Sequence, residues 1–371
     1  MAYLIFYSLV FFIVLLSKRW KNDVIYLMLC FVVISFSAFR YETGFDWPIY
    51  DRYLNNQLPI VYFPVFEIFK KIYIYSNADK VYFYFFISII GNAFVLSAAS
   101  KYFKSYRFIF VVFYVLWTDF YLIHSFSILR QFICLGFILY AFNRWIDARS
   151  YWPFLCLAML THHSSFIFLF FVFSFFWIKN LKFAYVWFVF IIFSFLFLAD
   201  VSIVKLLAKI VVSVYDFHYL EMYTKDNFNA SIPLKLVVLS SFAFILYFTF
   251  EIFKKKLIST NEYYFCLLYI FISVAFYSFP TLTTRVGLFF IFPIIKVVLI
   301  YLNRVIFIQR IIVLFWMVAI LTYSNYRFYS SELNVTYYPY QTWLINSDIE
   351  NSTGMERTQE VYNQLDKLGV F

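Results

Sequence analysis

Four charged residues gather within a dozen positions directly behind a strongly apolar run. The segment 40–51 holds these charges beside aromatic rings: Arg40, Glu42, Asp46 and Asp51, with Tyr41, Phe45, Trp47 and Tyr50. The whole chain is 64% hydrophobic and only 13% charged. Leaving an ionised group bare in hydrocarbon costs roughly several kcal/mol, so charged residues beside membrane-type sequence mark functional sites by default. This segment therefore predicts an active site at a membrane face.

Membrane helices are the elements that must position this segment. The hydrophobic fraction and a mean hydropathy of +0.79 exclude an ordinary soluble protein. Apolar runs that cross a bilayer, or nearly do, lie at 2–16, 24–39, 81–99, 108–123, 127–142, 152–162, 163–178, 183–199, 232–250, 263–280, 286–302 and 310–323. The predicted fold is an all-α polytopic membrane bundle of about 12 transmembrane segments, in a range of about 10–13. The two short runs around His162 form either a hairpin, a pair of half-helices or one long helix.

Basic residues indicate which connections face the cytoplasm. The short loops near 17–23, 100–107, 143–150, 179–182, 251–262 and 303–310 are rich in Lys and Arg and poor in acidic residues. The positive-inside rule places such loops on the cytoplasmic side. Both termini and the segments 40–80, 200–231 and 324–371 then lie outside. We expect a transmembrane domain over 1–323 and a separate acidic tail over 324–371.

Two short helices are expected in these outer segments. The stretch 60–75 alternates apolar and charged residues as an interfacial helix does, with Pro64 near its first turn. In the tail, Val361, Leu365 and Leu368 have the spacing of an apolar helical stripe.

The net charge and the cysteine positions limit which ligands and partners are expected. A net charge of +10 would suggest nucleic acid for a soluble protein, but here the charge marks topology, so no nucleic-acid partner is expected. The four cysteines lie inside apolar runs without metal-type spacing. We expect them to pack in the core, with no disulfide, no metal site and no cofactor.

Ionisable residues from distant helices are expected at one level near the outer membrane face: Arg40, Asp46, Asp119, His124, Arg130, His162, His163 and Arg285. Arginine grips phosphate with a permanently charged planar fork. We therefore predict that Arg40, Arg130 and Arg285, with Gln131, bind a lipid phosphate or diphosphate. The alternative is that each Arg side chain only snorkels to the interface.

A general base is expected at the same level. His162 ranks first, because histidine titrates near neutrality, and Asp46 ranks second. Asp46 could instead bind sugar hydroxyls or pair with Arg40. His163 is expected to face the opposite side of its segment.

Aromatic and acidic side chains near these charges suit sugars. Trp47 and Tyr50, with Glu67, are the candidates for saccharide binding, although such rings equally suit an interfacial aromatic belt.

Four motifs follow one another along the chain: Arg40-x-x-x-Gly44-x-Asp46-Trp47-x-x-Tyr50, then Leu129-Arg130-Gln131, then His162-x-Ser164-Ser165, and finally Arg285 before an apolar helix. In this order the chain resembles the EpsG/Wzy-type bacterial polysaccharide polymerases over roughly residues 1–325. That family usually has Thr or a small residue in place of Phe45, and Tyr in place of Trp47. These two differences leave the pattern of charged residues unchanged and affect only the expected contacts with sugars.

The resemblance implies a glycosyltransferase that polymerises undecaprenyl-diphosphate-linked oligosaccharide repeat units. The reaction would take place on the periplasmic side of the bacterial inner membrane and build O-antigen of lipopolysaccharide or a related surface polysaccharide. The growing glycan would pass from its lipid diphosphate to a hydroxyl of the incoming lipid-linked unit. The resemblance also implies a membrane protein partner that regulates chain length.

Other functions remain open from the sequence. A membrane glycosyltransferase or ligase that uses a polyprenyl-linked donor needs the same arginines and base. A flippase for lipid-linked glycans also accommodates about twelve helices, although transport favours polar residues throughout the bundle and an internal repeat. A glycan acyltransferase is disfavoured, because no acyl-carrying Ser or Cys motif stands out.

Overall fold

The computed structural model is helical throughout the residues it describes, which are 1–20, 22–57, 64–178, 183–201, 232–277, 280–304, 307–345 and 349–367. In these ranges the extended backbone is limited to an isolated bridge between Arg40 and Thr342. The predicted all-α class is confirmed. The chain forms two compact units, Met1–Ser165 together with the chain from Ile311 onward, and Phe166–Arg310.

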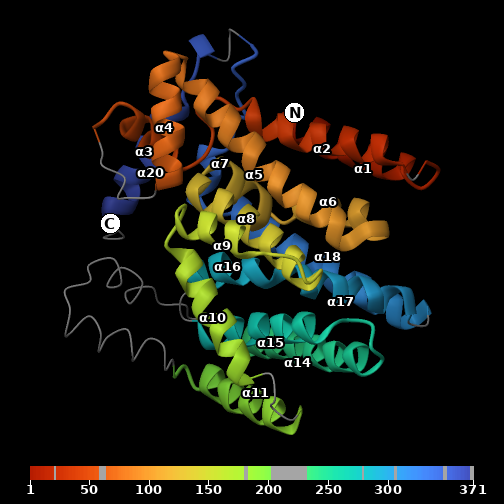
Figure 1. The fold of residues 1–371 in the computed structure, drawn as a ribbon. Helices are drawn as coiled ribbons and strands as arrows, with labels where there is room; N and C mark the ends of the chain where they lie inside the picture. The colour runs from red at the N-terminus through yellow and green to blue at the C-terminus, as the bar shows by residue number, and fades with distance from the viewer. Residues whose placement is uncertain are drawn as a thin grey trace. The chain divides into compact units, whose positions relative to one another are not determined.

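The first unit contains α1 (Ala2–Leu16), α2 (Asp23–Ala38), α3 (Trp47–Leu54), α4 (Pro64–Ser76), α5 (Lys80–Phe103), α6 (Arg107–Leu116), α7 (His124–Phe126), α8 (Leu129–Ile146), α9 (Trp152–Met159), most of α18 (Phe307–Tyr329) and α20 (Gly354–Lys367). Helix α5 lies at its centre and packs against α8 and α2. In Figure 1, α3, α4 and α20 gather at one end of this unit, and the α1–α2 and α5–α6 connections lie at the other. Long helices thus separate two polar ends.

Polar side chains inside the first unit satisfy one another. Asn92 of α5 donates from Nδ2 to Ser37 Oγ of α2 (2.8 Å) and to the Ser88 carbonyl (2.9 Å), and its Oδ1 accepts from Tyr114 of α6 (2.8 Å). Hydrogen bonds between helices are a main source of cohesion where lipid removes the hydrophobic driving force. This network joins α2, α5 and α6 directly behind Arg40.

The second unit contains α10 (Ser164–Ile178), α11 (Phe183–Leu198), α14 (Ile232–Lys254), α15 (Thr260–Ala275), α16 (Pro280–Gly287) and α17 (Ile291–Arg304). Helices α14, α15 and α17 pack together. Glu262 caps the beginning of α15 through Ser259 and also pairs with Lys296 of α17 at 2.5 Å. The ion pair ties two neighbouring helices at the same end.

Four helical stretches are long and apolar enough to cross a bilayer: Lys80–Leu116, Lys235–Lys254, Thr283–Arg304 and Gln309–Tyr329. Four shorter apolar helices accompany them in the described ranges. Helix α1, with 15 residues, is about 22 Å long, against about 30 Å of hydrocarbon. The protein is membrane-embedded, but the expected count of about twelve spans is not confirmed.

One expected segment differs from the observed helices. The run 108–123 is not one helix, because α6 ends at Leu116 and a π-helical turn follows over Asp119–Ile123. Of the alternatives left open around His162, the structure has two separate helices, α9 and α10, and not one long helix.

Three of the four cysteines are buried as expected, but Cys156 is exposed, because it lies on the outer side of the short helix α9.

Both short helices expected in the outer segments are present. Helix α4 begins at Pro64, and α20 buries Val361, while residues 60–63 and Leu368 lie outside the described residues. Almost all of the segment 200–231 lies outside them too. The tail packs within the first unit, where Tyr41 N donates to the Gln341 carbonyl (2.9 Å) and Trp343 N to the Phe39 carbonyl (3.2 Å). It therefore lies against the charged segment that follows α2.

Candidate functional site

Gly44 allows the charged segment to turn beneath α7 and α8. Its φ is +115°, and a Cβ atom there would lie 2.5 Å from the Phe126 carbonyl oxygen. Its N–H donates to the Thr336 carbonyl (2.9 Å), and the next N–H, of Phe45, donates to Ser127 Oγ (2.8 Å). Only glycine tolerates both this backbone conformation and this closeness. The turn delivers Asp46 to the beginning of α3.

Arg40 points into the protein interior. Its guanidinium is fully buried and donates to the Ser37 carbonyl, to Ser88 Oγ (2.6 Å) and to the Phe126 carbonyl (3.4 Å). These hydrogen bonds go to Ser37, Ser88 and Phe126, and none of them goes to Asp46. The three acceptors belong to α2, α5 and α7. Arg40 therefore links these three helices.

Aromatic rings complete the surroundings of Arg40. Its guanidinium carbon lies 5.1 Å from the Phe126 ring centroid, 5.7 Å from that of Tyr84 and 5.9 Å from that of Trp47. Burial lowers the pKa of Arg40 to about 10, so the side chain stays charged at neutral pH. Cation–π attraction is strongest when the cation is desolvated, as here.

Trp47 belongs to the same packed group. Its ring is 1% exposed and stacks on Tyr84, with centroids 3.6 Å apart and planes at 11°. Tyr84 also donates to the Trp47 carbonyl (3.2 Å). In this structure neither face of the ring is open to a sugar, because Tyr84 and the core cover it.

Arg130 lies beside Tyr50 and Asp46. The Arg130 N–H, at the beginning of α8, donates to the Tyr50 hydroxyl (3.4 Å), and the Arg130 side chain is half-buried. Burial raises the pKa of Tyr50; the charge of Arg130 opposes this rise and that of Asp46 adds to it. The neighbouring Gln131 is fully buried. Three of the predicted site residues thus come together from α3 and α8.

Glu67 and Tyr53 extend this group toward α4. Tyr53 donates to Glu67 Oε1 (2.6 Å), and Lys70 Nζ lies 4.1 Å from the Tyr53 ring centroid. Burial raises the pKa of Tyr53, as does its bond to Glu67, while the charge of Arg130 opposes the rise. We call Asp46, Tyr50, Tyr53, Glu67 and Arg130 the Arg130 cluster. It combines one guanidinium with two carboxylates and two phenols that stay protonated.

Asp46 is half-buried and directly precedes α3 in this cluster. It occupies the N-cap position of α3, but its carboxylate does not cap that helix. Its charge raises the pKa of Tyr50, Tyr337 and Tyr362. A half-buried carboxylate can accept a proton or bind a sugar hydroxyl.

His162 lies in the turn between α9 and α10, and its Nδ1 acts as an acceptor. The backbone N–H of Ser164 donates to this atom (3.1 Å), and Ser164 Oγ lies 2.8 Å from it. Because a backbone N–H can only donate, the neutral ring carries its proton on Nε2. In this arrangement His162 offers a hydrogen-bond donor, which suits an oxyanion better than it suits proton abstraction.

The His162 turn adjoins the other site elements. The Leu160 carbonyl accepts from Val65 N at the beginning of α4 (3.3 Å), and Ser164 and Ser165 lie near Cys134 of α8. His163 does not face the opposite side, because its ring centroid lies 4.1 Å from that of His162. The turn is not helical, so consecutive side chains are not rotated apart.

Residues 23–342 match the model of the EpsG family. The chain belongs to the EpsG family. This family includes Wzy-type polymerases, so membership indicates a polysaccharide polymerase-like function of the glycosyltransferase kind for this membrane-embedded protein. No curated protein and no solved structure gives a significant match.

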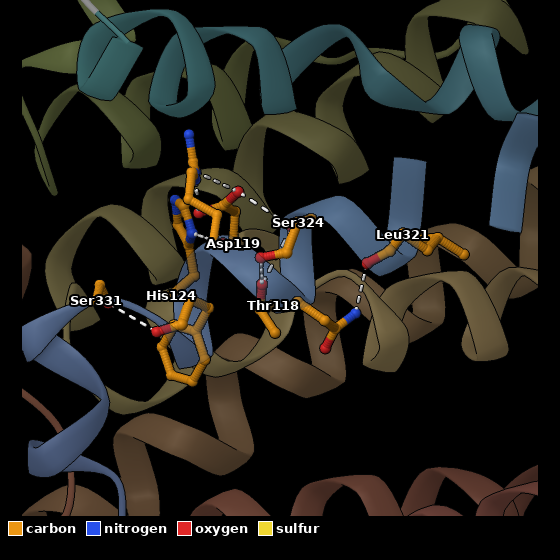
Figure 2. Close-up of polar contacts among 9 residues, drawn as sticks. Thr118, Asp119, His124, Leu321, Ser324 and Ser331 are labelled. Carbon is orange, nitrogen blue, oxygen red and sulfur yellow. Dashed lines mark hydrogen bonds and ion pairs between the residues drawn. The ribbon is translucent and has the colours of Figure 1, made fainter. Parts of the chain in front are cut away.

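Asp119 and His124 form a second polar group in the EpsG-family fold (Figure 2). Arg327 Nη2 of α18 lies 3.0 and 3.1 Å from the two Asp119 carboxylate oxygens, and Ser324 bonds to one of them at 3.5 Å. The His124 ring contacts the Asp119 carbonyl through Nδ1 (2.5 Å), while Thr118 meets Ser324 at 3.1 Å. The group joins the π-helical turn to α18.

Arg285 lies in the second unit of this EpsG-family protein. It is half-buried in α16, near the beginning of the apolar stretch Thr283–Arg304. Thr283 Oγ1 donates to the Phe276 carbonyl (2.6 Å) and fastens the start of α16 to the end of α15. Arg285 therefore stays a predicted phosphate ligand at the end of an apolar helix.

The tail residues that face the charged segment were not predicted from the sequence. Tyr337 meets Ser127 Oγ at 2.6 Å, Tyr362 donates to the Phe45 carbonyl (2.8 Å), and Ser352 donates to Glu42 Oε2 (2.6 Å). The dense aromatic run from Tyr337 to Trp343 was a signal for such packing. The described residues hold no group of three His, Cys, Asp or Glu side chains placed to bind a metal.

Proposed function

We propose that this protein polymerises undecaprenyl-diphosphate-linked oligosaccharide repeat units on the periplasmic side of the bacterial inner membrane. The observation that carries the proposal is the Arg130 cluster, in an EpsG-family chain, at the end of the unit where α3 and α4 lie. A half-buried guanidinium between carboxylates and protonated phenols can bind a diphosphate and sugar hydroxyls together. The product would be O-antigen or a related surface polysaccharide.

The reaction is a glycosyl transfer with a diphosphate leaving group. A hydroxyl oxygen of the incoming lipid-linked unit bonds to the anomeric carbon of the growing chain. The bond from that carbon to the lipid diphosphate breaks, and the diphosphate leaves with the electron pair. Arg130 stabilises the negative charge that develops on it, so the step needs no metal. Arg285, in the second unit, is proposed separately as a ligand of a lipid phosphate.

Asp46 is the proposed base, and His162 the proposed donor to an oxyanion. The proton of the attacking hydroxyl passes to the Asp46 carboxylate, whose charge raises the pKa of Tyr50, Tyr337 and Tyr362. The proton of the neutral His162 ring lies on Nε2, because Nδ1 accepts from the Ser164 backbone. This reverses the order expected from reference pKa values alone.

Complementation of a polymerase-deficient host with the matching glycan pathway tests the proposal. Lipopolysaccharide ladders would be compared for the unchanged protein, Arg130→Ala, Arg130→Lys and Asp46→Asn at matched protein levels. We expect a ladder for the unchanged protein and a single repeat unit for Arg130→Ala and Asp46→Asn. Arg130→Lys should give a weak ladder, because lysine keeps the charge but not the fork. Loss of a general base typically costs about 10²–10⁴-fold in rate.

Arg149→Ala is the matched control. Arg149 is exposed beyond the other end of α8, so its removal should leave the ladder unchanged. His162→Gln should reduce the ladder without changing the pH profile, whereas a changed profile would assign the base to His162.

The same experiment separates the rival functions. Full ladders from Arg130→Ala, or none from the unchanged protein, would reject the polymerase. If cells that lack the protein trap lipid-linked units in the cytoplasmic leaflet, the protein would be a flippase instead. A chain-length regulator is the protein partner we propose, and the distribution of ladder lengths with and without it would reveal its effect.

A further inference from the structure

A cavity of about 760 Å³ opens at the end of the first unit that lies away from α3, α4 and α20 (Figure 1). It is formed where α1 ends, α5 ends and α6 begins. Tyr3, at the beginning of α1, donates a hydrogen bond to the Tyr337 carbonyl of the tail. Lys80, at the beginning of α5, forms an ion pair with Asp51. The far ends of both helices therefore lie a helix length away from the Arg130 cluster.

The cavity carries positive charge. Lys18, Lys104 and Arg107 line it, and the described residues contribute no acidic side chain to its lining. Arg107 is paired with Asp23 at 2.7 Å. Lys18 and Lys104 are exposed and have no ion-pair partner among the described residues. Two uncompensated ammonium groups at one opening attract an anion.

Apolar side chains form the rest of the wall. Val14 of α1 and Phe108 and Ile109 of α6 line the cavity beside Ser17 and Ser105. Ile109 is 44% exposed, and Leu15 near it on α1 is 59% exposed, so the apolar surface continues along the outside of both helices. A basic opening joined to an apolar surface fits an amphiphile better than a free ion.

Lys104 is held at this opening by an unfavourable backbone. Its φ is +47°, and leaving the right-handed region costs a non-glycine residue about 1–2 kcal/mol. Such strain persists where the surrounding structure enforces it, and it concentrates at functional positions. Here it reverses the chain between α5 and α6 and places a lysine at the rim.

We propose that this cavity binds the phosphate headgroup of an anionic phospholipid. Lys18 and Lys104 neutralise the headgroup, Ser105 is close enough in the lining to donate to a phosphate oxygen, and an acyl chain lies along α1 and α6. Basic pockets between membrane helices recognise anionic headgroups in this way. The site is separate from the proposed polymerisation site and does not depend on it.

Retention of lipid by the purified full-length protein tests this proposal. The protein would be reconstituted in nanodiscs of phosphatidylglycerol or of phosphatidylcholine, released, and analysed by native mass spectrometry. We expect phosphatidylglycerol to be retained and phosphatidylcholine to be lost. Each ammonium group that neutralises the bound headgroup contributes about fivefold in affinity, so Lys18→Gln with Lys104→Gln should weaken retention by roughly 25-fold.

The matched control is Lys254→Gln with Lys255→Gln, which removes two exposed lysines at the end of α14. It should retain phosphatidylglycerol like the unchanged protein. If the double variant of the cavity fails to fold, Lys18→Gln alone should show a decrease of about fivefold.

Three outcomes would overturn the proposal. The first is equal retention of both lipids, and the second is full retention by the cavity variant. The third is stabilisation by inorganic phosphate in detergent that equals the effect of phosphatidylglycerol, which would identify a soluble anion as the ligand.

Discussion

At the scale of single residues, two arginines of similar sequence context have opposite environments. Arg40 is fully buried and donates to Ser37, Ser88 and Phe126, whereas Arg130 is half-buried beside Tyr50. Arg40 stabilises the fold, because it donates hydrogen bonds to three helices. Arg130 can contact a substrate, because its side chain is partly exposed. The two side chains should therefore differ in what their loss affects.

Substituting each arginine by glutamine separates the two roles. Arg40→Gln should lower the free energy of unfolding by about 2–3 kcal/mol, because buried acceptors lose their charged donor. Arg130→Gln should change the melting temperature little and abolish the glycan ladder. Thermal unfolding in detergent, measured beside complementation, checks both. A stable but inactive Arg40→Gln protein would show instead that Arg40 binds substrate.

At the scale of elements, the ion pair between Asp119 and Arg327 joins the π-helical turn to α18. Burial raises the pKa of Asp119, and Arg327 opposes that rise. A raised pKa in the folded state means that the folded protein binds the proton more tightly than the unfolded chain does. Stability then falls as the pH rises from the unfolded pKa toward the folded one.

A double-mutant cycle measures this pair. Arg327→Gln should destabilise by about 1–2 kcal/mol, a value reduced because Arg327 is half-exposed. Asp119→Asn should cost less and should remove this pH-dependent component from the melting temperature. A double variant that loses no more stability than Arg327→Gln alone would indicate full coupling, whereas additive losses would show that the pair contributes nothing jointly.

The tail helix α20 depends on close contact with the segment after α2. A Cβ atom on Gly354 would lie 2.1 Å from the Glu42 carbonyl oxygen, whereas one on Gly287 would lie 3.4 Å from the Tyr269 ring. Gly354→Ala should therefore displace α20 at a cost of about 1–3 kcal/mol, and Gly287→Ala should not. Hydrogen exchange of α20 amides checks the displacement. Unchanged protection in Gly354→Ala would contradict the close packing.

At the scale of the whole molecule, the two ends of the first unit should face opposite sides of the membrane. The loop at Ser105 is basic, and the positive-inside rule places it in the cytoplasm. The connection at Ser76 lies toward the other end, after α4. This arrangement puts the proposed lipid cavity and the Arg130 cluster in different leaflets.

Cysteine labelling in intact cells tests this orientation. In a background with Cys156→Ser, which removes the exposed native thiol, Ser76→Cys should react with a membrane-impermeant maleimide. Ser105→Cys should react only after permeabilisation. The reverse pattern would invert the topology and place the Arg130 cluster in the cytoplasm.

The sequence by itself determined the membrane class, the family likeness and nearly all helix positions, including α4 and α20. Composition and local periodicity carry that information, because a helix forms its backbone hydrogen bonds within its own segment. The same locality explains why the run 152–162 predicts a helix but not the residue at which it ends, which is Met159 in the structure. Local apolar runs do not specify where a helix must break.

Only the tertiary structure decided which side chains of the charged segment face inward. Arg40 meets Phe126, which lies 86 residues further along the chain, and Trp47 is covered by Tyr84. The tail closes over this segment through Tyr337 and Tyr362. Such partners are set by how helices pack, and one residue type serves as a core donor or as a ligand according to the space left around it.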